Sequence, residues 1–184
     1  YRAIPSGTYA VSDAVMRDVE QAPYGEHPSN LGAYLAKKLG DMVGIPAFFV
    51  DPVCVDEMTE VAHVSGFREF RRQSLFHALN QKATARKAAE QMGKRYEDVK
   101  LIVCHLGGGV SVGAHQHGRV VDVCNVKDEG SMGMDRAGGL PVNQLINYCF
   151  SGKTKDEVKR TFGRRAGMFS YLGTTDFRVV CAKV

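Results

Sequence analysis

The sequence predicts an α/β protein whose sheet includes an antiparallel part. Segments with helical periodicity alternate with short apolar runs along the 184 residues. Residues 101–123 read LIVCHLGGGVSVGAHQHGRVVDV, three strand-like runs joined by tight turns, which indicates adjacent antiparallel strands. Because 44% of the residues are hydrophobic and 24% are charged, the composition favours a packed core over disorder. We therefore expect a mixed sheet flanked by helices.

The N-terminal part predicts two helices and a strand. Ser12 and Asp13 resemble a helix cap before an apolar-periodic segment, and residues 31–42 carry one apolar stripe. Residues 45–50 (IPAFFV) form a continuous apolar run, as expected of a strand buried on both faces. The run ends at Asp51, in the position where open α/β sheets bind ligands.

The centre of the chain holds the strongest helical signal, at residues 74–92. Ser74 suits its N-cap, Gly93 suits its C-cap, and His77 then falls in the first turn. The positive end of the helix dipole there favours a nearby anion.

The C-terminal third predicts helices at residues 140–150 and 155–162, after a glycine-rich loop. Residues 169–173 suggest a short strand or turn, and the segment that ends at Asp176 suggests a helix cap.

Charge and cysteine content narrow the class of protein. The net charge of +4 is dispersed, so we expect no nucleic-acid partner, although an anionic small molecule would suit it. Five cysteines without a CxxC pair favour a reducing compartment. No apolar stretch is as long as a membrane span and no signal peptide is recognised, so we expect a cytoplasmic protein. The start at Tyr1 and the apolar end suggest a piece of a longer chain.

Gly107, Gly108 and Gly109 are the first candidate site. Glycines between strands can aim several backbone N–H groups at one anion, commonly a phosphate, although a plain turn is the alternative. The pattern is neither a P-loop nor a dinucleotide fingerprint.

Several charged or titratable side chains are further candidates. His77 lies in the first turn of the predicted helix, His105 precedes the glycines, and His27 lies in a polar loop, yet isolated histidines are commonly structural. Arg136, between glycines, could pair with phosphate or carboxylate or simply lie on the surface. Asp51 could hold magnesium or cap a turn.

The two remaining histidines of the hairpin, His115 and His117, are expected to be solvated at its turn. No histidine pair has the i, i+4 spacing of a helical metal site, and no serine nucleophile elbow is present.

Seven segments together resemble the acetate kinase family, within the sugar kinase, heat-shock protein 70 and actin fold group. They are YGEHPSN (24–30), IPAFFVDPV (45–53), SLFHALNQKA (74–83), LIVCHLGGGVSVGAH (101–115), RAGGLPV (136–142), CFSGK (149–153) and YLGTTDFR (171–178). The resemblance implies a partial actin-like ATPase (ribonuclease H-like) fold. Residues 1–54 would end the first actin-like domain, and residues 55–184 would form most of the second, nucleotide-binding domain.

The resemblance also implies an activity. The family transfers the γ-phosphoryl group of ATP, with Mg²⁺, reversibly to a carboxylate, here butyrate or a related short-chain acid. Acetate or propionate kinase, or a non-catalytic nucleotide-binding fragment, are alternatives. ATP or ADP and a carboxylate would be the ligands, and a homo-oligomer is expected.

The family's functional residues carry over onto matching positions. His77 would steady the transferring phosphoryl group, Arg136 would hold substrate and transition-state charge, and His27 and Asn30 would lie in an active-site loop. Asp51 would position magnesium. The phosphate hairpin would comprise His105, Gly107, Gly108, Gly109 and Ser111, and the adenine pocket Asp176, Phe177 and Arg178.

The chain also departs from the family pattern. The family's first phosphate-binding strand and its second arginine would precede Tyr1 and have no counterpart in these residues. The family's C-terminal glutamate that binds magnesium has no counterpart either. Ala137 stands where the family commonly has serine, and the loop at 127–135 is unusual. The resemblance therefore implies roughly the middle half of the enzyme.

Overall fold

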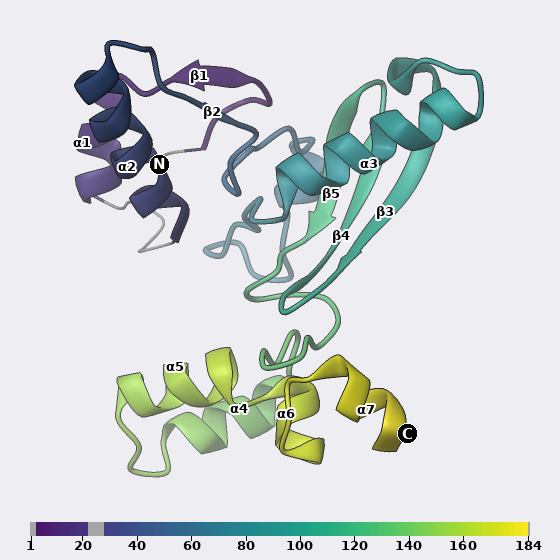
Figure 1. The fold of residues 1–184 in the computed structure, drawn as a ribbon. Helices are drawn as coiled ribbons and strands as arrows, with labels where there is room; N and C mark the ends of the chain where they lie inside the picture. The colour runs from purple at the N-terminus through teal and green to yellow at the C-terminus, as the bar shows by residue number, and fades with distance from the viewer. Residues whose placement is uncertain (1–2, 22–27, 184) are drawn as a thin grey trace.

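A computed structural model describes residues 3–21 and 28–183. Figure 1 shows three groups in chain order: an N-terminal group, a central sheet with one long helix, and a C-terminal set of helices. The elements are β1 (Thr8–Ala10), α1 (Asp13–Gln21), α2 (Pro28–Val43), β2 (Phe48–Val50), η1 (Val61–His63), α3 (Ala78–Gln91), η2 (Tyr96–Asp98), β3 (Lys100–Leu106), β4 (Val110–Gln116), β5 (Arg119–Cys124), α4 (Val142–Cys149), α5 (Lys155–Arg164), α6 (Gly167–Leu172) and α7 (Phe177–Lys183).

The N-terminal group confirms both predicted helices but not the doubly buried strand. β2 is a three-residue strand that pairs antiparallel with β1, with Tyr9 opposite Phe49. Phe48 is 54% exposed and Val50 42% exposed, so only one face of β2 packs against the described chain. The continuous apolar run at residues 45–50 therefore wrongly predicted a strand that is buried on both faces. Val11, Ala33 and Cys54 form the small core of this group.

The central sheet confirms the predicted antiparallel strands. Its order is β3-β4-β5, and the β3–β4 hairpin pairs without a break from Lys100 opposite Gln116 to Leu106 opposite Val110. The register of β4 with β5 shifts between Ala114 and His115. Along β4, alternate residues are buried, and α3 runs along the sheet (Figure 1).

Helix α3 begins three residues later than the predicted N-cap implies. Ser74 is buried, and its hydroxyl donates to the carbonyl oxygen of Val55 at 2.6 Å instead of capping the helix. His77 takes the N-cap position, without a side-chain cap bond. The prediction failed because a distant carbonyl competes for the serine hydroxyl, which local sequence does not reveal.

The C-terminal helices follow the predicted order, with one correction. Residues 169–173 lie mostly in helix α6, not in a strand or turn, and that helix ends at Gly173 in the left-handed conformation. Thr154 and Glu157 form a capping box at α5. The carboxylate of Asp176 accepts from the Arg178 backbone N–H at 2.9 Å, which confirms the predicted cap before α7. Among the described helices, none has the length and apolar character needed to cross a bilayer.

Arg72 fastens the loop after β5 to the sheet. Its guanidinium contacts the carboxylates of Glu129 at 2.9 Å and Asp122 at 3.0 Å, and it donates to the carbonyl oxygens of Ala62 and Val123. These carboxylates raise the pKa of Arg72 above its usual range, the Glu129 hydrogen bond most of all. Because one planar guanidinium contacts four partners at once, it holds the loop after β5 in one arrangement. This loop continues to Arg136.

A buried ion pair fixes the other side of the central unit. Lys82, on the inner face of α3, is 1% exposed and lies 2.7 Å from the carboxylate of Glu57. The same carboxylate oxygen accepts from the Val120 backbone N–H at 3.0 Å, and the Lys82 ammonium donates to the Gly118 carbonyl oxygen at 3.2 Å. The pair therefore ties α3, β5 and the segment before η1 together.

We predict that Glu57→Ala lowers the free energy of unfolding by roughly 3 kcal/mol, because it leaves the buried Lys82 ammonium without its counter-ion. The double variant Glu57→Leu, Lys82→Met should recover most of that loss, since no charge is then buried. Urea unfolding measures both. Asp41→Ala, which breaks the exposed Lys37–Asp41 pair, is the matched control and should leave the midpoint nearly unchanged. Equal effects of the two alanine variants would contradict this assignment.

Candidate functional site

Two predicted site residues converge at the glycine turn between β3 and β4. Gly109 is buried, and a side-chain carbon added to it would lie 2.6 Å from Val126, 2.7 Å from the Arg136 guanidinium nitrogen Nη1 and 3.3 Å from His77 Cε1. Only a residue without a side chain permits that approach. The Gly107 N–H donates to the Gly109 carbonyl oxygen at 3.2 Å, which closes the turn.

His77 is held from two sides. Its ring stacks on the ring of His105, with centroids 3.6 Å apart and planes 9° from parallel. Its Nδ1 lies 2.8 Å from the hydroxyl oxygen of Ser111. The His105 ring is fixed in turn by Asn80, whose Oδ1 lies 2.9 Å from His105 Nδ1. The structure thus brings His77, His105 and Ser111 together at the hairpin.

Arg136 reaches this place from a loop that is itself anchored. The Arg136 carbonyl oxygen accepts from the Gly133 N–H at 3.0 Å, and the next residue, Ala137, donates to the carbonyl oxygen of Phe162 in α5 at 2.9 Å. The Arg136 side chain is half-buried. A guanidinium and an imidazole beside the same glycine turn can bind an anion with several oxygens, such as a phosphoryl group.

A buried layer of polar residues, which we did not predict from the sequence, lies beneath the hairpin. Ser111 and His115 lie on the same face of β4, and both meet Gln81 of α3. Tyr96 contacts the far side of His115, with its hydroxyl 2.7 Å from Nδ1. Gly113 lies between Ser111 and His115, and any side chain there would collide with Gln81 Oε1. The signal in the sequence was the two-residue spacing of Ser111, Gly113 and His115, which places all three on one strand face.

The prediction that His115 is solvated was wrong, whereas His117 is exposed in the turn. His115 is 1% exposed, and burial, with a smaller contribution from the Lys82 cation, lowers its pKa to about 4. Burial also raises the pKa of Tyr96 to about 12. The two histidines differ because His115 lies within β4 on the buried face, whereas His117 lies beyond the last residue of that strand, in the turn.

The Asp51 carboxylate accepts hydrogen bonds from the turn in which it lies. Its Oδ1 accepts from the Ser6 hydroxyl at 2.6 Å and the Gly7 N–H at 2.8 Å, while Oδ2 lies 3.9 Å from the Arg86 guanidinium. Its backbone has a positive φ of 40°. No three His, Cys, Asp or Glu side chains of the described residues gather as a metal site. The geometry fits a turn-capping aspartate and does not fit a direct metal ligand.

Two of the other predicted residues cannot be placed at the hairpin or away from it, and the C-terminal ones contact each other or solvent. His27 and the side chain of Asn30 fall outside what the structure describes, although Asn30 lies within α2. Asp176 and Arg178 pair with each other at 2.8 Å, and Phe177 is 67% exposed. Figure 1 draws their helix, α7, with the C-terminal group. Their proposed role at adenine stays a prediction.

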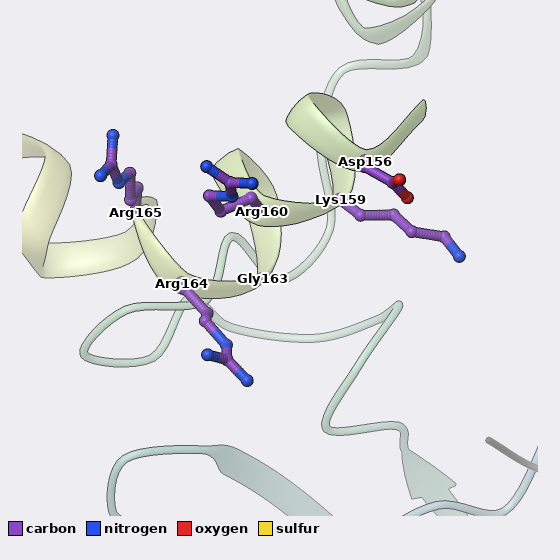
Figure 2. Close-up of a pocket in the computed structure, with 6 residues that line it drawn as sticks. All are labelled: Asp156, Lys159, Arg160, Gly163, Arg164 and Arg165. Atoms are coloured by element: carbon purple, nitrogen blue, oxygen red, sulfur yellow. The ribbon is translucent and has the colours of Figure 1, made fainter. Parts of the chain in front are cut away.

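A separate hollow of about 620 Å³ lies along α5, where four of the six lining residues are basic. Figure 2 shows that the Arg164 and Arg165 side chains leave the backbone in opposite directions, so the cations do not converge on one point. The lining residues are Asp156, Lys159, Arg160, Gly163, Arg164 and Arg165. We assign this surface no role in the site.

Residues 64–184 match the profile of the acetokinase family. Since this match covers more than half of the chain, the chain belongs to the acetokinase family. It is 51% identical over 185 aligned positions to a probable butyrate kinase of Listeria monocytogenes serotype 4a, and 47% identical over 184 to butyrate kinase 1 of Clostridium acetobutylicum. These alignments cover 100% and 99% of this chain but 52% of each relative, so the chain spans about half the length of the curated relatives it matches.

Solved structures show the same fold at lower sequence identity. Acetate kinase of Porphyromonas gingivalis superposes with a TM-score of 0.79 at 23% identity, covering 95% of this chain and 47% of that one. A propionate kinase of Francisella tularensis gives a TM-score of 0.77 at 17% identity, covering 98% and 51%. The predicted actin-like fold, in part, is thereby confirmed.

We predict a pH-dependent stability that originates at His115. The folded pKa of about 4 lies below the ordinary value of 6.5, so the unfolded chain binds the proton first and stability falls as pH drops from 6.5 towards 4. At pH 5 this costs about 2 kcal/mol relative to pH 8. Urea unfolding at both pH values should show a smaller difference for His115→Gln, whereas the exposed control His117→Gln should retain it. A full pH difference in His115→Gln would refute the assignment.

Proposed function

We propose that this chain forms part of a carboxylate kinase, which moves the γ-phosphoryl group of ATP reversibly to butyrate or a related short-chain carboxylate. The observation that supports it most is the convergence of His77 and Arg136 on Gly109 at the turn of the β3–β4 hairpin. Family membership and two relatives named as butyrate kinases, at 51% and 47% identity, agree with this proposal.

The proposed chemistry needs positioning and charge, not a nucleophile from the protein. During phosphoryl transfer, charge spreads over three equatorial oxygens, and fixed donors around them lower the barrier. Backbone N–H groups at Gly107–Gly109 would hold phosphate oxygens. His77 and Arg136, which both lie beside Gly109, would donate to the transferring group.

Magnesium and the nucleotide base are less well supported by the described residues. Mg²⁺ would neutralise phosphate charge when bound, whereas Oδ1 of Asp51 already accepts two hydrogen bonds within its own turn. A metal role for Asp51, through water, stays a prediction, and we derive no step from it. The homo-oligomer and the domain boundary at residue 54 also stay predictions.

The carboxylate that accepts the phosphoryl group could also be acetate or propionate. The curated relatives are named for butyrate, which favours the longer acid, whereas the acetate and propionate kinases share only the fold. Rates over a series of carboxylates, measured on the protein encoded by the complete reading frame, would separate these substrates.

The proposed activity can be tested by trapping acyl phosphate with hydroxylamine. We expect trapping with ATP, Mg²⁺ and butyrate for the protein from the complete reading frame, and little or none for these 184 residues alone. The reason is that the chain covers 52% of the relatives' length. Robust activity of the 184 residues would overturn the second expectation. A longer protein that binds ATP without making acyl phosphate would favour a non-catalytic nucleotide-binding module instead.

For Arg136→Ala in the longer protein we expect kcat to fall by roughly 100-fold or more, because a donor to transition-state charge is lost. The affinity for ATP should change much less. Steady-state kinetics with both substrates varied will show the split, and Arg95→Ala, at an arginine whose side chain is 77% exposed, serves as the control. Equal losses of kcat and ATP affinity would point to a structural role.

A further inference from the structure

A continuous chain of hydrogen bonds runs under the hairpin from Tyr96 to His77. The Tyr96 hydroxyl lies 2.7 Å from His115 Nδ1, and His115 Nε2 lies 3.2 Å from Gln81 Oε1. Gln81 Nε2 lies 2.9 Å from the hydroxyl oxygen of Ser111, which lies 2.8 Å from His77 Nδ1. The three middle residues are at most 1% exposed, so water does not compete for these bonds.

One bond fixes the direction of the whole chain. Gln81 Nε2 also lies 3.1 Å from the backbone carbonyl oxygen of Ser111, and a carbonyl can only accept. The amide nitrogen of Gln81 must therefore face Ser111, and Gln81 Oε1 must face His115. Since Oε1 also only accepts, the hydrogen between them belongs to His115 Nε2.

The remaining hydrogens then follow from valence. With its proton on Nε2, a neutral His115 accepts at Nδ1 from the Tyr96 hydroxyl. At the other end, the Ser111 oxygen accepts from Gln81 Nε2 and, at 3.4 Å, from the His77 backbone N–H. Both lone pairs of that oxygen are used, so its single hydrogen is left for His77 Nδ1.

We propose that Gln81, backed by His115 and Tyr96, is a positioning residue that holds His77 as the neutral imidazole with its proton on Nε2. Nδ1 is then the acceptor, and the ring nitrogen remote from Ser111 is the donor. The consequence for catalysis rests on the proposed function, in which His77 donates to the transferring phosphoryl group.

The far end of the chain is chemically suited to keep its direction. Burial lowers the pKa of His115 to about 4 and raises that of Tyr96 to about 12. Near neutral pH, His115 therefore keeps one acceptor nitrogen and Tyr96 keeps the proton that it donates. Gly113 makes room for the amide of Gln81 against the strand, so the helix can come close enough to complete the chain.

The test is Gln81→Glu in the protein encoded by the complete reading frame. Once ionised, a carboxylate of the same shape offers no hydrogen to Ser111, so the Ser111 hydroxyl turns towards it and its oxygen then accepts from His77 Nδ1–H. Because the Ser111 carbonyl oxygen can only accept and so opposes this ionisation, the measurement is made at alkaline pH. Nitrogen-15 NMR of labelled histidines, with His77→Gln used to assign the signal, reads which ring nitrogen carries the proton. We expect Nε2–H in the wild type and Nδ1–H in Gln81→Glu. Because the donor to the phosphoryl group is lost, kcat should fall about 100-fold with little change in ATP affinity.

Controls separate this proposal from the proposed function and from misfolding. Gln91→Glu makes the same change at an exposed position of the same helix and should keep Nε2–H and full kcat. Ser111→Ala, which removes one hydroxyl, should leave His77 as a mixture of tautomers if the glutamate variant does not fold. A wild-type His77 with its proton on Nδ1, or an unchanged tautomer in the folded Gln81→Glu and Ser111→Ala variants, would overturn the proposal. A switched tautomer with unchanged kcat would uphold the positioning role and refute the catalytic role of His77.

Discussion

The docking of α3 on the central sheet depends on two adjacent polar side chains that have no access to water. Gln81 is 0% exposed and Lys82 is 1% exposed. A buried amide or ammonium costs several kcal/mol unless its hydrogen bonds are made, so each must meet its own partners on the sheet side. Lys82 finds Glu57 and the Gly118 carbonyl oxygen, whereas Gln81 finds Ser111. Apolar contacts alone would allow α3 to shift slightly along the sheet. Two neighbouring polar residues with separate hydrogen-bond partners do not allow such a shift.

This constraint places the candidate site. His77 precedes Gln81 by four residues, about one helical turn, so a helix fixed at Gln81 also fixes its own N-terminus above the glycine turn. On the sheet side, Gly109 and Gly113 allow the close approach. A side chain at Gly109 would collide with Arg136 of the loop, and one at Gly113 would collide with Gln81 of α3. The stability of the central unit and the geometry of the site are therefore set by the same contacts.

Local patterns predicted those features whose cause lies within a few residues. The hairpin, its glycine turn and the Asp176 cap belong to this class. Three other features depend on distant partners. Ser74 is diverted by the Val55 carbonyl, residues 45–50 find a partner on only one face, and His115 lies beneath a helix that begins 37 residues earlier. Arg136 and His77 are 59 positions apart, so their convergence came from a family resemblance and could not come from spacing.

The electrostatics of the site explain why a directed hydrogen-bond chain matters there. Two imidazoles stacked at 3.6 Å, with the Arg136 guanidinium beside the same turn, would repel one another strongly if the rings were charged. A neutral His77 avoids that repulsion before any anion binds and still offers one N–H donor. A buried serine and glutamine determine which ring nitrogen carries this proton. Because neither is a carboxylate, they add no negative charge near the place where phosphate would bind. A carboxylate in the position of Gln81 or Ser111 would draw the ring proton to Nδ1 and would also repel the phosphoryl group, whereas the uncharged chain leaves the proton on Nε2 without that cost.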